Sequence, residues 1–87
     1  MPDRETLMEW VVDAIRANQG SATIVEVCKH VWENHEDELR YSGDGFYTWQ
    51  YDIRWAGQKL RDNGFLKPVS LSPKGVWILS EKSKRYR

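Results

Sequence analysis

The sequence predicts a small α+β domain in which three helices are followed by a two-stranded β-hairpin. Three observations support this expectation. Apolar residues recur at helical spacing in three segments. Capping residues and glycines bound those segments. Two short runs rich in β-branched and aromatic residues follow near the C-terminus, separated by a turn sequence. We expect one domain over residues 1–80, followed by a basic flexible tail over residues 81–87 that frays.

The first helix begins near the N-terminus. Asp3 and Thr6 both qualify as its N-cap, and Glu9 completes a capping box with Thr6. Gly20 marks its end. The residues expected on its buried side are Leu7, Trp10, Val11, Ala14 and Ile15.

A short extended link over Ser21 and Ala22 leads to the second helix. Thr23 and Glu26 form a second capping box. We expect Cys28 to be a small core residue rather than a reactive thiol, which needs an electropositive, partly exposed setting. The buried stripe of this helix comprises Ile24, Val27, Cys28 and Val31, with Trp32 at its margin.

Residues 34–45 interrupt the apolar pattern with a polar, acidic and glycine-containing stretch. Leu39 and Tyr41 are its only sizeable apolar residues. We therefore expect a loop with room for one helical turn. A loop of about twelve residues is long, which suits either mobility or a contact of its own.

The third helix is expected over Phe46–Asn63, with Gly64 at the position of a C-terminal capping glycine. A turn of about 100° per residue divides its side chains into two faces. One face is apolar and comprises Phe46, Trp49, Ile53, Ala56, Gly57 and Leu60. The other comprises Tyr47, Tyr51, Arg54, Trp55 and Gln58, residues that suit contact with a partner better than hydration.

Two strands, Phe65–Val69 and Val76–Leu79, are expected to form the hairpin. Pro68 suits an edge strand, and residues 72–75 suit the turn. Helix, link, helix, loop, helix and hairpin is the element order of the winged helix-turn-helix. The alternative is a mixed domain with three helices and an unrelated hairpin.

The charge is distributed unevenly along the chain. Residues 1–45 carry a formal charge of −6 and residues 46–87 carry +6, so the net charge is zero. Such asymmetry indicates a polyanion partner at the basic end. No apolar run of about 18 residues and no signal peptide is present, so we expect a cytoplasmic protein without membrane contact.

The composition argues against an enzyme. A single cysteine cannot form an internal disulfide or a cysteine-based zinc site. His30 and His35 lack the paired spacing of zinc ligands, and no phosphate-binding glycine loop or catalytic triad pattern occurs. We expect no catalytic residue, no cofactor, no metal and no small-molecule substrate.

A series of short motifs runs from residue 42 to residue 81. A small-residue turn at Ser42-Gly43 and an aromatic at Phe46 come first. The others are Trp55-Ala56, Leu60, Asn63-Gly64-Phe65-Leu66, Pro73-Lys74-Gly75-Val76-Trp77 and Leu79-Ser80-Glu81. These motifs resemble the N-terminal winged-helix domain of Mrr-type restriction endonucleases, which has a Trp-Ala pair, a leucine, a glycine turn and a Gly-Val-aromatic strand.

The resemblance covers about residues 6–83 and implies a domain that recognises DNA for an attached nuclease. Two features depart from the family. Its basic or amide residues before the Trp-Ala pair are here Tyr51 and Asp52. No nuclease domain follows in this sequence, so we expect no cleavage unless the chain is a fragment of a larger protein in a restriction or regulatory system.

We expect the outer face of the third helix to enter the major groove of double-stranded DNA. Arg54 suits a bidentate pair with guanine, and Gln58, one turn later, suits adenine. Tyr47 and Tyr51 can donate hydrogen bonds to phosphates.

Three further cations, Lys59, Arg61 and Lys74, are expected to neutralise phosphates, with Lys74 at the wing tip. Trp55 has two interpretations, packing against the wing or the long loop, or contact with a ligand.

A second function class stays open. The stripe formed by Tyr47, Tyr51 and Trp55 also suits a protein partner or a homodimer.

Overall fold

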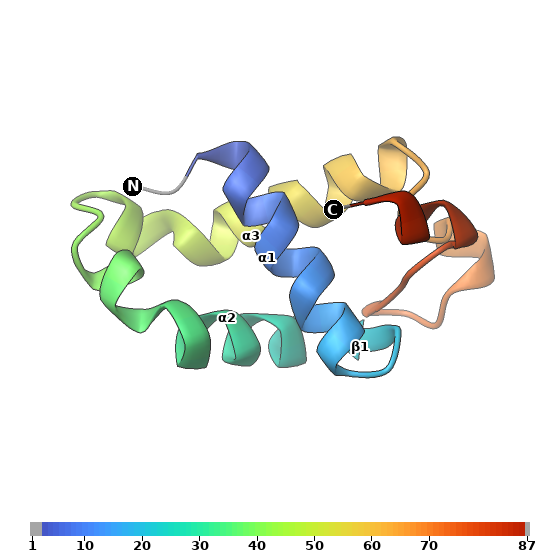
Figure 1. Cartoon of the computed structure of the whole chain (residues 1–87), viewed down its shortest axis with the longest axis horizontal. Helices are drawn as coiled ribbons and strands as arrows, with labels where there is room; N and C mark the ends of the chain where they lie inside the picture. Colours follow the sequence, from blue (N-terminus) through green and yellow to red (C-terminus); the bar gives the residue numbers. More distant parts are fainter. Residues whose placement is uncertain (1–2, 87) are drawn as a thin grey trace.

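The computed structural model describes residues 3–86 and contains three α-helices and a two-stranded antiparallel sheet within that range. Helices α2 and α3 run along the long axis, and α1 packs against both (Figure 1). The elements are α1 (Arg4–Ala17), β1 (Ser21–Thr23), α2 (Ile24–Arg40), α3 (Gly45–Asp62), the 3₁₀ turn η1 (Val69–Leu71), β2 (Val76–Ile78) and the 3₁₀ turn η2 (Glu81–Arg85).

Capping side chains set the starts of α1 and α2. Of the two N-cap candidates for α1, Asp3 takes the position, and its carboxylate accepts a hydrogen bond from the Thr6 amide at 2.8 Å. The capping box of Thr23 and Glu26 is confirmed, with reciprocal hydrogen bonds of 2.8 and 3.1 Å. These bonds satisfy amide groups that have no partner within the helix.

Helix α2 is longer than the sequence predicts, and the predicted loop over residues 34–45 is wrong for residues 34–40. A kink at His35 interrupts regular helical geometry, but the helix continues to Arg40. Leu39 is fully buried, and the His35 ring stacks on Trp10 with 3.7 Å between ring centroids. Burial of Leu39 and this stack hold a segment whose polar composition alone suggests a loop.

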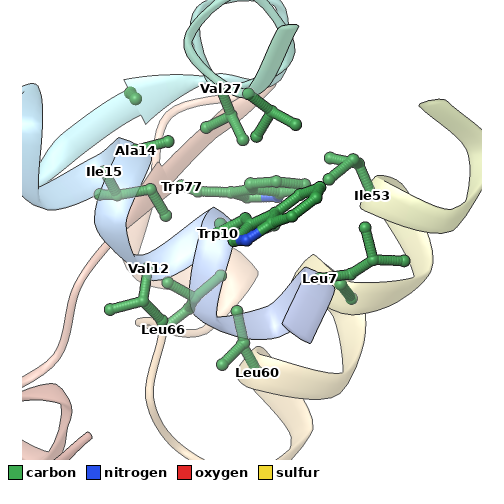
Figure 2. Close-up of a cluster of buried hydrophobic side chains, with 14 of the residues drawn as sticks. Leu7, Trp10, Val12, Ala14, Ile15, Val27, Ile53, Leu60, Leu66 and Trp77 are labelled. Carbon is green, nitrogen blue, oxygen red and sulfur yellow. The ribbon is translucent and has the colours of Figure 1, made fainter. Parts of the chain in front are cut away.

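Helix α3 agrees with the sequence prediction and begins one residue earlier, at Gly45. Five of the six residues expected on its apolar face are buried, and Phe46 is half-buried. Trp10 and Trp77 lie at the centre of the hydrophobic cluster (Figure 2). A methyl group built on Gly57 would overlap the six-membered ring of Trp77, so the absent side chain makes room for the indole.

The sheet pairs two strands that are far apart in the sequence. β1 pairs with β2 in antiparallel register, with Ala22 opposite Trp77. The predicted partner, residues 65–69, forms no strand and pairs only at an isolated bridge between Leu66 and Leu79. Two backbone hydrogen bonds flank that bridge, from Lys67 to Ile78 at 2.8 Å and from Ser80 to Phe65 at 3.0 Å. Residues 69–71 form a 3₁₀ turn. The prediction of a regular hairpin is therefore wrong, because Pro68 cannot donate to a ladder and β1 supplies the main pairing.

The described part of the C-terminal segment is packed against the domain, although we expected residues 81–87 to fray. The Arg16 guanidinium donates to the carbonyl oxygens of Ser83 at 2.9 Å and Tyr86 at 2.7 Å. Ser83 is 4% exposed, and the Tyr86 ring meets Phe65 edge-on. Arg87 lies outside the described residues.

The arrangement is an α+β domain compatible with a winged helix. None of the helices within residues 3–86 has both the length and the apolar character needed to cross a bilayer.

Candidate nucleic-acid interface

The outward face of α3 carries the residues that the sequence singles out. Tyr47 is 84% and Tyr51 76% exposed, and Arg54 and Gln58 are also exposed. Their spacing of four, three and four residues aligns them along one stripe. The Gln58 amide donates to the Asp62 carboxylate at 2.9 Å through one of its two N–H groups.

A groove of about 620 Å³ separates α2 from the first half of α3. Its polar lining residues are Lys29 from α2 and Gln50 from α3, both exposed. The apolar lining consists of Val25, Cys28, Trp32, Phe46 and Trp49.

Helical spacing places Arg54 on the α2 side of α3, because Gln50, four residues earlier, lines the groove. Burial raises the pKa of the Cys28 thiol, and the positive charge of Arg54 acts in the opposite direction. Cys28 lines the groove, half-buried, and its raised pKa argues against a reactive thiolate.

The turn before β2 lies beside the start of α2. The Val76 amide donates to the Pro73 carbonyl at 3.1 Å, and Gly75 adopts a φ of +76°, which favours glycine. The Ile24 amide donates to the Gly75 carbonyl at 3.3 Å. Lys74 is exposed in this turn, next to the N-terminus of α2.

Arg61 lies on the same side as Lys74. Both line a groove of about 270 Å³ that also includes Ile24. The Arg61 guanidinium donates to the Lys67 carbonyl at 2.9 Å, which directs it toward the segment leading into the turn. We call the surface formed by Lys29, Gln50, Arg54, Arg61 and Lys74 the α2 flank of α3.

Lys59 and Trp55 belong to a different surface. They line a groove of about 460 Å³ together with Arg4 and Arg85. The Arg4 guanidinium carbon lies 4.4 Å from the centroid of the Trp55 ring, and Trp55 is half-buried. Trp55 thus packs against α1 rather than against the turn before β2 or the acidic segment. We call the surface formed by Arg4, Trp55, Lys59 and Arg85 the α1 flank of α3.

Sequence reasoning missed Lys29 and Gln50. Gln50 lies four residues before Arg54, so helical spacing alone places the two on one side of α3. Lys29 is on another helix, and only the packing of α2 against α3 brings it to this groove.

The acidic residues closest in sequence to this surface are engaged locally. Glu26 belongs to the capping box, and Asp62 accepts the Gln58 hydrogen bond. Asp52 accepts a hydrogen bond from the Thr48 hydroxyl at 3.3 Å. No group of three or more histidine, cysteine, aspartate or glutamate residues within the described range could hold a metal ion.

The chain matches no protein-family model, no curated protein and no solved structure. The resemblance to the Mrr N-terminal domain stays a prediction carried by the residues quoted for it.

Proposed function

We propose that the chain is a winged-helix DNA-binding module whose helix α3 enters the major groove. The observation that carries this proposal is the α2 flank, where two helices and a turn bring four cations to one side of α3. Two acidic residues close to them in sequence, Glu26 and Asp62, accept hydrogen bonds through their carboxylates. A phosphate backbone is the ligand that such a row of cations favours.

The topology supports the same proposal. In a winged helix, a short strand precedes the second helix, and the wing is the turn that leads into the last strand. Here β1 precedes α2, and residues 67–75 lead from the Leu66 bridge into β2. In this proposal that segment is the wing, and Lys74 contacts a phosphate.

Base recognition is assigned to the centre of α3. Arg54 donates two hydrogen bonds to guanine, and Gln58 or Gln50 pairs with adenine. Tyr47 and Tyr51 donate to phosphates and fix the register of the helix in the groove. The Mrr resemblance suggests that such a module serves as the recognition part of a restriction or regulatory system.

A salt titration against generic duplex DNA tests the proposal. If Lys29, Arg61 and Lys74 each neutralise one phosphate, the logarithm of the affinity falls by about 3 per tenfold rise in salt. Absence of duplex binding at low salt, or binding that hardly responds to salt, contradicts the proposal.

Cys28 offers an independent test because it is the only cysteine and borders the α2 flank. Bound duplex should slow its alkylation, since DNA would cover the groove between α2 and α3. The measurement is the rate of labelling with and without duplex, read by mass spectrometry. An unchanged rate at saturating duplex places the binding surface elsewhere.

A second candidate function is protein binding through Tyr47 and Tyr51. Their high exposure favours it, because large exposed aromatic side chains are typical of interface hot spots. Trp55 does not complete this stripe, since Arg4 covers its ring. An aromatic protein interface should respond weakly to salt, so the titration separates the two functions.

A further inference from the structure

Two oppositely charged segments of the chain lie at opposite ends of the molecule. Its principal extents are 36 × 22 × 19 Å. The acidic segment around residues 33–44 forms one end of the long axis, and residues 65–85 form the other (Figure 1). Residues 33–44 carry a formal charge of −4 and residues 65–85 carry +4, so a single chain presents two ends of opposite charge.

The acidic end presents an exposed aromatic side chain. Tyr41 is 86% exposed, and its ring and hydroxyl make no contact with the described residues through a ring pair or hydrogen bond. Asp37 and Asp44 flank it in sequence and are exposed. Glu36 and Glu38 are paired with Arg40 and His35, whereas no ion pair within residues 3–86 engages Asp37 or Asp44.

The groove of the α1 flank has the complementary chemistry. Its aromatic lining comes from Trp55, Phe65 and Tyr86, and it holds about 460 Å³. Lys59 and Arg85 are exposed at its edge, and neither forms an ion pair with a described carboxylate. Glu5 and Glu9 line its α1 side, so an acidic ligand has to enter from the side of α3 and η2.

We propose that this groove binds the Tyr41 end of a second copy of the chain. The tyrosine ring would enter the groove, and Asp37 and Asp44 would pair with Lys59 and Arg85. The two surfaces differ, so the contact is heterologous and each bound copy leaves one groove and one acidic end free. The result is head-to-tail association that grows with concentration and weakens with salt.

The association uses a different surface from the proposed DNA contact. Arg54, Arg61 and Lys74 lie on the α2 flank and stay accessible in a head-to-tail chain. The inference therefore does not depend on DNA binding, and its test contains no DNA.

Sedimentation velocity of the full chain over rising concentration tests the inference. We expect concentration-dependent association at about 50 mM salt that weakens about tenfold or more at about 500 mM, as screening shortens the reach of the charges. A chain that stays monomeric at millimolar concentration in low salt overturns the inference. Binding of an acidic aromatic peptide from another protein to the groove would not rescue it in that case.

Two end-blocked variants show whether the contact is heterologous. The first, Tyr41→Ser with Asp37→Lys, removes the acidic end, and the second, Lys59→Glu with Arg85→Glu, blocks the groove. Each alone should be monomeric. Their equimolar mixture should form a dimer and nothing larger, because one intact groove meets one intact acidic end. A mixture that stays monomeric overturns the inference.

A matched control separates the groove from net charge. Lys29→Glu with Lys74→Glu changes the charge by the same amount on the α2 flank, and this variant should still associate. If the control variant loses self-association to the same extent as the groove variant, the assignment of the contact to the groove is overturned. Circular dichroism melting verifies that every variant is folded, which we expect because all substituted side chains are exposed.

Discussion

The two flanks of α3 carry cations of the same helix but differ in what surrounds them. On the α2 flank, Arg61 lines a groove with the turn that holds Lys74, and Arg54 lies one turn from Gln50, which lines the groove between α2 and α3. On the α1 flank, Lys59 lies beside an aromatic groove in which Arg4 covers Trp55. Basic residues only a few positions apart on one helix therefore have different surroundings, because different elements pack beside each face.

Gly57→Ala should have the largest effect, because it disturbs the core that holds both flanks. The added methyl group overlaps the Trp77 ring, which has to shift within a packed cluster. We expect the free energy of unfolding to fall by about 1–3 kcal/mol. Urea unfolding measures the loss. Gln58→Ala, at the exposed next residue, is the control and should change stability by about 0.5 kcal/mol or less.

Arg54→Ala compares the flanks directly. We expect duplex affinity to fall by about 1–3 kcal/mol and sequence preference to relax, because a bidentate base contact is lost. Lys59→Ala removes the same charge from the α1 flank and should leave duplex affinity nearly unchanged. Fluorescence anisotropy with several duplexes measures both variants. Equal losses would show that the flanks do not differ in DNA binding.

Lys74→Ala should have a smaller effect of a different kind. Loss of one phosphate contact should weaken binding to all sequences alike and reduce the salt slope by about 1. Repeating the salt titration with this variant gives the slope. A change in sequence preference, with the slope intact, would assign Lys74 to base recognition instead.

Glu26→Gln should have the smallest effect of the four substitutions, a change in how thermal stability depends on pH. Glu26 lies at the start of α2, beside the α2 flank. Hydrogen bonds from Thr23 lower the pKa of the Glu26 carboxyl. Its stabilising contribution is therefore complete above the pKa of the unfolded chain and is lost as the pH falls through the lower folded value. As the pH falls from about 5 to about 3, the melting temperature of Glu26→Gln should fall less than that of the natural chain. Parallel curves for the two proteins would contradict this expectation.

Local patterns predicted most of the helical structure. The capping box at Thr23 and Glu26, the link at residues 21–22 and the apolar face of α3 were all readable from spacing. The end of α2 was not, although Glu36 and Arg40 have the spacing of a helical ion pair, observed here at 2.7 Å. The polar composition of this segment favoured a loop over a helix. One isolated leucine gives no periodic pattern, so the burial of Leu39 could not be predicted.

The candidate site was predictable only in part. Helical periodicity placed Tyr47, Tyr51, Arg54 and Gln58 on an outward stripe, and these side chains are exposed. It did not separate Lys59 from Arg61 and Lys74, and it missed Lys29 and Gln50. Periodicity gives angles around one helix axis, whereas the neighbour on each side depends on how the helices pack.

The sequence by itself determined the helices, their caps, the buried side of α3 and the opposite charges of the two halves, because each of these follows from local spacing and composition. Tertiary structure decided the pairing of β1 with β2, the extension of α2, the packing of residues 81–86 and the division of α3 into two flanks. These features depend on contacts between residues far apart in the chain, whose energies appear only when the core has formed around Trp10 and Trp77.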